Sequence, residues 1–99
     1  MPVAATELEA MPADIRARFG RIANLIETHG LEQVREPHIK HLKGRLWEMR
    51  MTGRDGIVRA LYVAAAERRV VVVRLFTKKT QKTPAREIRL VERRAKEVA

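Results

Sequence analysis

Three strand-like runs in the middle of the chain constrain its fold more than any other feature of the sequence. They cover Leu46–Met51, Ile57–Ala65 and Arg69–Thr77, and only short segments with turn chemistry separate them. Apolar and polar residues alternate in the first run, as in a strand with one buried face, whereas the valines of the third run indicate burial on both faces. These runs predict an antiparallel sheet of about three strands.

Helical patterns flank the three runs, over Pro12–His29 and Pro84–Val98. Apolar residues recur in both at the spacing of one helix face. These residues are Ile15, Phe19, Ile22 and Ile26 in the first helix and Ile88, Val91, Ala95 and Val98 in the second. Leu31–Leu42 is predicted to be a short helix or a turn, because Pro37 disfavours helical geometry at the preceding residue. We therefore expect one α+β domain, residues 1–99, with N-terminal helices packed on the sheet and a C-terminal helix.

Positive charge is concentrated in the second part of the chain. The net charge is +9. Residues 1–37 hold four arginines against six carboxylates, whereas residues 38–99 hold 17 lysines and arginines against six carboxylates. Such a surface attracts polyanions and supports contacts to phosphates. The outward basic residues of the last helix are expected to form either a binding surface or simply a solvated helix face. These residues are Arg86, Arg89, Arg93 and Lys96.

The sequence gives no indication of a disulfide, a metal site or a membrane span. It holds no cysteine, and the apolar run that includes Leu61–Ala66 is far shorter than the roughly 18 residues that span a bilayer. His38 and His41 have a spacing compatible with metal ligands, but no third ligand lies nearby, so we expect surface histidines. The cytoplasm is the expected location.

The segment Leu75–Pro84 has the composition of an anion receptor. It contains Thr77, Lys78, Lys79, Thr80, Lys82 and Thr83. No carboxylate occurs between Glu67 and Glu87. Thr83 followed by Pro84 reads as an N-cap with proline at the first helical position, and such a helix start offers free backbone donors to a phosphate.

Three arginines are predicted to form one row across the sheet. If residues 54–55 and 66–67 close tight hairpins, Arg50 lies opposite Arg59, and Arg59 lies opposite Arg74. Like charges directly opposite one another destabilise a sheet, so the row is expected where an external anion neutralises it. The alternative is a β-bulge that shifts one register and leaves the side chains reaching for water.

Segments 46–50 (LWEMR), 58–62 (VRALY) and 76–84 (FTKKTQKTP) resemble the phage-derived branch of the HigB/RelE toxins of bacterial type II toxin–antitoxin systems. The likeness extends from about Met11 to the C-terminus. It implies a RelE-like fold and a small basic endoribonuclease that cuts translated messenger RNA on the ribosome. It also implies neutralisation by an antitoxin, expected to be a helix-turn-helix protein. Relatives usually begin with a strand, and residues 1–6 (MPVAAT) are too few and too alanine-rich to fill that place, which leaves one sheet edge in doubt.

The resemblance also implies site residues. The catalytic positions that it indicates are Arg59, Lys78, Lys79 and Lys82, and Arg50, Arg74, Thr80 and Tyr62 are the expected contacts to phosphate or RNA. Arginine and lysine suit the charge that grows on a phosphoryl oxygen, and crowded cations can lower a lysine pKa until it acts as a base. Tyr62 is expected either to stack on a base or to pack in the core. The sequence shows no carboxylate cluster for metal ions, so cleavage without metal or cofactor is expected.

Two other functions are compatible with these observations. A ParE-like toxin would share the fold but inhibit DNA gyrase and spare RNA. A non-catalytic nucleic-acid-binding module would use charge alone, and single substitutions would then act uniformly.

Overall fold

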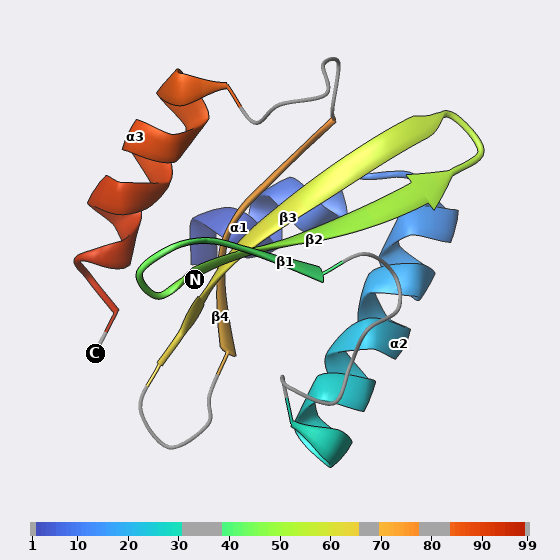
Figure 1. Ribbon diagram of the computed structural model, residues 1–99. Helices are drawn as coiled ribbons and strands as arrows, with labels where there is room; N and C mark the ends of the chain where they lie inside the picture. The colour runs from blue at the N-terminus through green and yellow to red at the C-terminus, as the bar shows by residue number, and fades with distance from the viewer. Residues whose placement is uncertain (1, 31–38, 66–69, 78–83, 99) are drawn as a thin grey trace.

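The computed structural model describes residues 2–30, 39–65, 70–77 and 84–98 of the chain. Its elements follow the order α1 (Pro2–Glu9), α2 (Ala13–His29), β1 (Ile39–Lys43), β2 (Leu46–Gly53), β3 (Gly56–Ala64), β4 (Val70–Thr77) and α3 (Ala85–Ala95) (Figure 1). This arrangement confirms the α+β class and both predicted helices. None of the described helices is long and apolar enough to cross a bilayer.

The described strands form one antiparallel sheet in the order β1-β2-β3-β4. The sheet therefore has one strand more than expected, because Ile39–Lys43 is strand β1 and not part of a helix or turn. Residues 31–38 of that predicted segment lie outside the described residues. β1 is a short edge strand with Lys40, His41 and Lys43 exposed, and charge of this kind protects a sheet edge. The same charge removes the apolar signal by which a strand is predicted.

The register of the β2–β3 hairpin confirms the prediction. Gly53 is opposite Gly56, so residues 54–55 form the loop, and Arg50 is opposite Arg59.

The predicted register of the β3–β4 hairpin is wrong. Arg59 is opposite Phe76, and Arg74 is opposite Leu61, with a bulge next to Leu61 and Tyr62. The structure thus confirms the bulge of the alternative, but Arg59 and Arg74 pair with carboxylates and do not reach for water. Arg74 does not continue the row of Arg50 and Arg59.

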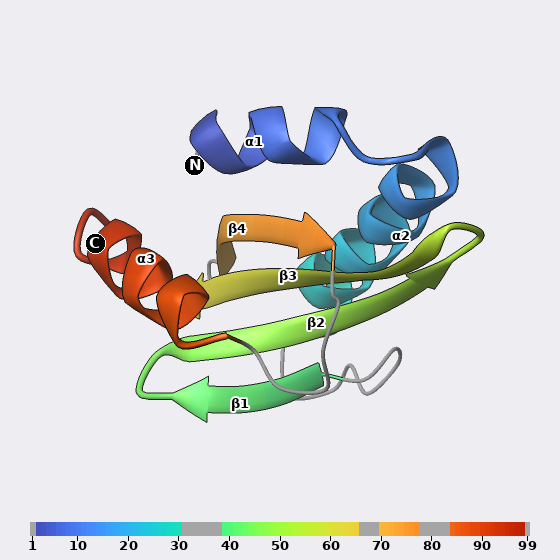
Figure 2. The ribbon, with the colours of Figure 1, turned by 90° about the horizontal axis from the view of Figure 1, so that it is seen from above.

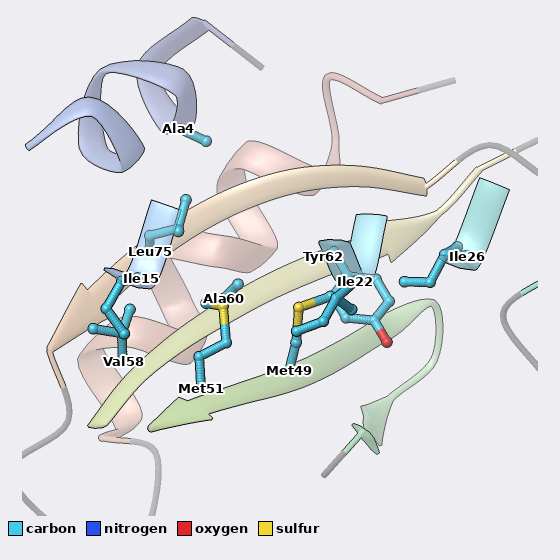
Figure 3. Close-up of a cluster of buried hydrophobic side chains, with 10 residues drawn as sticks. All are labelled: Ala4, Ile15, Ile22, Ile26, Met49, Met51, Val58, Ala60, Tyr62 and Leu75. Atoms are coloured by element: carbon cyan, nitrogen blue, oxygen red, sulfur yellow. The ribbon is translucent and has the colours of Figure 1, made fainter. Parts of the chain in front are cut away.

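The sheet is covered on both faces. Figure 1 shows α2 and α3 on opposite sides of the strands. On the α2 side, three buried isoleucines of the helix face the sheet in a core of Ala4, Ile15, Ile22, Ile26, Met49, Met51, Val58, Ala60, Tyr62 and Leu75 (Figure 3). On the α3 side, Val91 packs in a second core with Leu46, Leu61, Val63 and Val73. Burial on both faces explains the nearly continuous apolar runs of β3 and β4.

The start of the chain forms helix α1 and not a strand, and this helix lies beside β4 (Figure 2). Glu7 Oε1 accepts a 3.1 Å hydrogen bond from the backbone N–H of Leu75, and Arg94 Nη1 donates a 2.6 Å bond to the carbonyl oxygen of Val73. Side chains thereby satisfy two backbone groups of the edge strand that another strand would otherwise pair. The β4 edge is protected by a helix and its charges.

Replacing Glu7 with alanine is expected to lower the free energy of unfolding by about 2 kcal/mol, because a part-buried carboxylate that accepts from Leu75, Arg74 and Arg94 is lost. Urea denaturation measures this. Glu9→Ala on the exposed side of the same helix is the matched control, with an expected effect within about 0.5 kcal/mol. Equal effects of the two substitutions would contradict the role given to Glu7.

Asp14 joins the start of α2 to the tip of the β2–β3 hairpin. Its Oδ2 accepts a 2.7 Å hydrogen bond from the backbone N–H of Arg54, and this bond is the main reason why the pKa of Asp14 lies below its usual value. The hairpin approaches so closely because Gly53 has no side chain; a Cβ there would lie 2.6 Å from Cδ1 of Ile15. The hairpin that carries two of the predicted site arginines is thus fixed to α2.

Candidate nucleic-acid interface

Glu48, Arg50 and Arg59 form a charged cluster on β2 and β3. Arg50 and Arg59 are direct partners across the two strands. Glu48 lies two residues before Arg50 and therefore on the same face of β2. Its Oε2 accepts a 3.0 Å hydrogen bond from Arg59 Nη1, and its Oε1 lies 3.9 Å from Arg50 Nη2. Each carboxylate oxygen thus faces a different guanidinium.

The two arginines of this cluster differ in burial. The side chains of Arg59 and Glu48 are 2% and 3% exposed, whereas that of Arg50 is 31% exposed. Burial lowers the pKa of the Arg59 guanidinium, and the charge of Glu48 opposes this change; the group stays protonated because arginine starts so far above neutral pH. Arg59 is therefore an internal cation. Arg50 is the member of the pair that reaches solvent.

Glu48 was not among the predicted site residues, although the sequence contains a signal for it. The carboxylate of Glu48 lies next to both guanidinium groups and reduces the repulsion between them. The cluster of two guanidinium groups and one carboxylate keeps a net positive charge. The alternation in β2 already places Glu48 on the face of Arg50. The confirmed hairpin register adds that Glu48 is opposite Leu61 and hence diagonal to Arg59.

The lysine-threonine run, residues 78–83 (KKTQKT), begins directly after β4 in the sequence. Phe76 is opposite Arg59 and Thr77 is opposite Val58, so the last described residues before the run belong to the same end of the sheet as Arg59. Four predicted site residues, Lys78, Lys79, Thr80 and Lys82, lie outside the described residues. The run ends before Pro84, which occupies the N-cap of α3, one residue away from the first helical position predicted for it.

Arg74 is engaged in the fold and not in the Arg50–Arg59 cluster. Its Nε and Nη2 donate to both carboxylate oxygens of Glu87 at 2.9 and 3.2 Å, and its Nη1 donates to Glu7. The hydrogen bond to Glu87 is the main reason why the pKa of Arg74 is raised. The guanidinium also lies over the ring of Phe76, 5.7 Å from the centroid. Arg74 thus joins α1, β4 and α3.

Tyr62 lies on the opposite face of the sheet, in the core under α2 (Figure 3). The side chain is fully buried, and burial raises the pKa of its hydroxyl group. No hydrogen-bond partner for that hydroxyl is present among the residues that the structure describes. Of the two alternatives for Tyr62, the structure confirms packing.

The outward basic residues of α3 form a separate exposed row. Arg86, Arg89, Arg93 and Lys96 are exposed, and within the described parts of the chain none of them makes an ion pair. Arg94 of the same helix points inward to Glu7 instead. The row is consistent with the solvated helix face predicted from the sequence. Its members carry the same charge as Arg50 but lie outside the Arg50–Arg59 cluster.

Of the two histidines with metal-ligand spacing, His41 belongs to the described residues. His41 is exposed, its Nε2 lies 2.7 Å from the carbonyl oxygen of Gly44, and its ring lies 4.9 Å from that of Trp47. Across residues 2–30, 39–65, 70–77 and 84–98, no group of three or more potential metal ligands comes together. His38 lies outside these ranges.

The chain thus combines a small α+β fold with a cationic cluster on β2 and β3. Residues 6–96 match the family described as phage derived protein Gp49-like (DUF891), and the chain belongs to this family. Gp49-like proteins are a RelE/HigB-like toxin family associated with toxin–antitoxin systems. No curated protein matches the chain. The resemblance noted in the sequence is confirmed at the level of this family.

Proposed function

We propose that this protein is the toxin of a type II toxin–antitoxin system and acts in the cytoplasm as a ribosome-dependent endoribonuclease on translated messenger RNA. The observation that carries the proposal is the pair Arg50 and Arg59, direct neighbours on β2 and β3 at the end of the sheet where the lysine-threonine run begins. Membership of a toxin family and the net charge of +9 support it.

The proposed reaction needs three groups. A base takes the proton of the 2′-hydroxyl, the 2′-oxygen attacks the adjacent phosphorus, and an acid protonates the 5′-oxygen as its bond to phosphorus breaks. Positive side chains stabilise the charge that grows on the phosphoryl oxygens. We assign that task to Arg50 at the protein surface and to Lys78, Lys79 and Lys82, with a lysine of the run as the candidate base. This division needs no metal ion.

Arg59 has a supporting part in this proposal. Its side chain is buried and hydrogen-bonded to Glu48. A buried arginine in this position fixes the Glu48 side chain and contributes positive charge, whereas Arg50 contacts the phosphate. Thr80 remains a proposed phosphate contact. Arg74 and Tyr62 are not included, because the first is paired with two carboxylates and the second is buried.

The proposed partner is an antitoxin, expected to be a helix-turn-helix protein encoded beside the toxin. An exposed cationic site that cuts messenger RNA must be silenced in the producing cell. Co-expression with the neighbouring gene should therefore restore growth that the toxin alone arrests, as measured by colony counts after induction. Failure of both neighbouring genes to restore growth would contradict this part of the proposal.

A cell-free translation reaction tests the proposed function against gyrase inhibition. Added protein should stop synthesis and leave the messenger cut, whereas supercoiling of plasmid DNA by purified gyrase should proceed unchanged. Intact messenger together with blocked supercoiling would establish a ParE-like activity instead. Intact messenger with retarded RNA in a gel, abolished by salt, would establish a plain nucleic-acid-binding module.

A further inference from the structure

We propose that Glu48 is a positioning residue of the RNA site, which sets the orientation of Arg50 and Arg59 and limits the charge of the cluster. This inference rests on the proposed function. Glu48 is buried, and its two oxygens face two different arginines, at 3.0 Å for Arg59 and 3.9 Å for Arg50. Among the described residues, Glu48 is thus the carboxylate that the two guanidinium groups share.

A carboxylate at this point solves a problem that the strand register creates. The register places two guanidinium side chains opposite one another, and a buried cation without a counter-charge is strongly unfavourable. Glu48 relieves both effects because it is on the same face and between the two groups. The shorter contact of Glu48 is with the buried Arg59, so Glu48 holds Arg59 more tightly than Arg50.

The looser contact leaves Arg50 able to bind a second anion. At 3.9 Å from Glu48 its Nη2 is beyond hydrogen-bond range. The side chain also reaches solvent. A phosphate of the RNA can therefore dock on Arg50 while Glu48 keeps the base of the cluster unchanged.

This arrangement makes anion binding and cleavage respond differently when the charge of Glu48 is removed, because only cleavage should fall. Glu48→Gln keeps the shape of the side chain and one acceptor oxygen. It removes a negative charge, so the net charge of the cluster rises by one. Anions should bind at least as tightly. The two guanidiniums should repel one another and lose their alignment, so that cleavage slows by about a hundredfold, the cost of a small misplacement of a reacting group. A merely structural role would not separate these two quantities.

The test measures two quantities on the purified full-length protein. The first is single-turnover cleavage of a messenger on programmed ribosomes, which separates the maximal rate from the concentration for half-maximal rate. The second is binding of inorganic phosphate by titration calorimetry. Glu92→Gln is the matched control, since it also raises the net charge by one but lies half-exposed on α3, paired with Lys43. All variants are compared below the unfolding temperature found by circular dichroism.

The expected result for Glu48→Gln is a large fall in the maximal rate with unchanged or tighter binding of phosphate, whereas Glu92→Gln behaves as the wild type. Glu48→Asp keeps the charge on a shorter side chain, so it should bind phosphate normally and cleave slowly; it carries the test if Glu48→Gln does not fold. Normal cleavage by a folded Glu48 variant, or loss of binding and cleavage in proportion to the unfolded fraction, would overturn this inference alone. A wild type that never cuts translated messenger would overturn the proposed function and this inference with it.

Discussion

Replacing Arg50 with alanine is expected to lower messenger cleavage by about a hundredfold or more, because the substitution removes the surface guanidinium that stabilises the transition state. The fold should stay intact, since the Arg50 side chain is partly exposed and the main ion pair of the cluster is between Glu48 and Arg59. Binding of the ribosome should fall much less than the cleavage rate. Single-turnover kinetics on programmed ribosomes separate the two.

Arg89→Ala is the matched control for this prediction. Arg89 is an exposed arginine of α3 that makes no ion pair among the described residues, so its loss removes the same charge away from the cluster. If Arg89→Ala impaired cleavage as severely as Arg50→Ala, the basic surface would act as a whole, with no special position.

Replacing Arg59 with alanine should instead destabilise the protein, by about 3 to 5 kcal/mol, because it leaves Glu48 buried without its closest counter-charge. Guanidinium chloride denaturation monitored by circular dichroism measures the change. Cleavage activity should then fall for two reasons: less of the protein is folded, and the cluster has lost one of its guanidinium groups. The structure thus separates two arginines that the sequence places side by side.

A double substitution shows whether Arg59→Ala lowers stability by breaking the ion pair with Glu48 or by removing packed side-chain atoms. Replacing Glu48 and Arg59 together with methionine should recover most of the lost stability, since apolar residues of similar volume often substitute well for a buried ion pair. Cleavage should remain low, because the cluster is gone. If Arg59→Ala alone were as stable as the wild type, the ion pair would have no structural part.

The helices and the first hairpin were predictable from the sequence because each carries a strong local signal. The isoleucines of α2 recur at helical spacing, and the glycines at both ends of the β2–β3 loop mark a tight turn that fixes the register. Turn chemistry alone therefore predicts that Arg50 and Arg59 are neighbours. The lysine-threonine run stays a prediction, because it lies outside the described residues.

The remaining differences have physical causes. Strand β1 is short, exposed and charged, so it lacks the apolar alternation of a strand. Strand β4 begins with four valines that are apolar on both faces, and in such a run a one-residue bulge changes no polarity pattern that a sequence could show. Arg74 was misplaced for that reason. Its partners Glu7 and Glu87 lie 67 and 13 residues away in sequence, so only the folded chain reveals that it is neutralised.

We propose that this protein cuts messenger RNA only during translation. Mapping of 5′ ends tests it most directly, on two copies of one messenger that differ only in the start codon, after the protein is added to a cell-free translation reaction. New 5′ ends should appear within the reading frame of the translated copy and be absent from the untranslated one, and Arg50→Ala should abolish them. Equal cleavage of both copies, or no new ends in either, would contradict it.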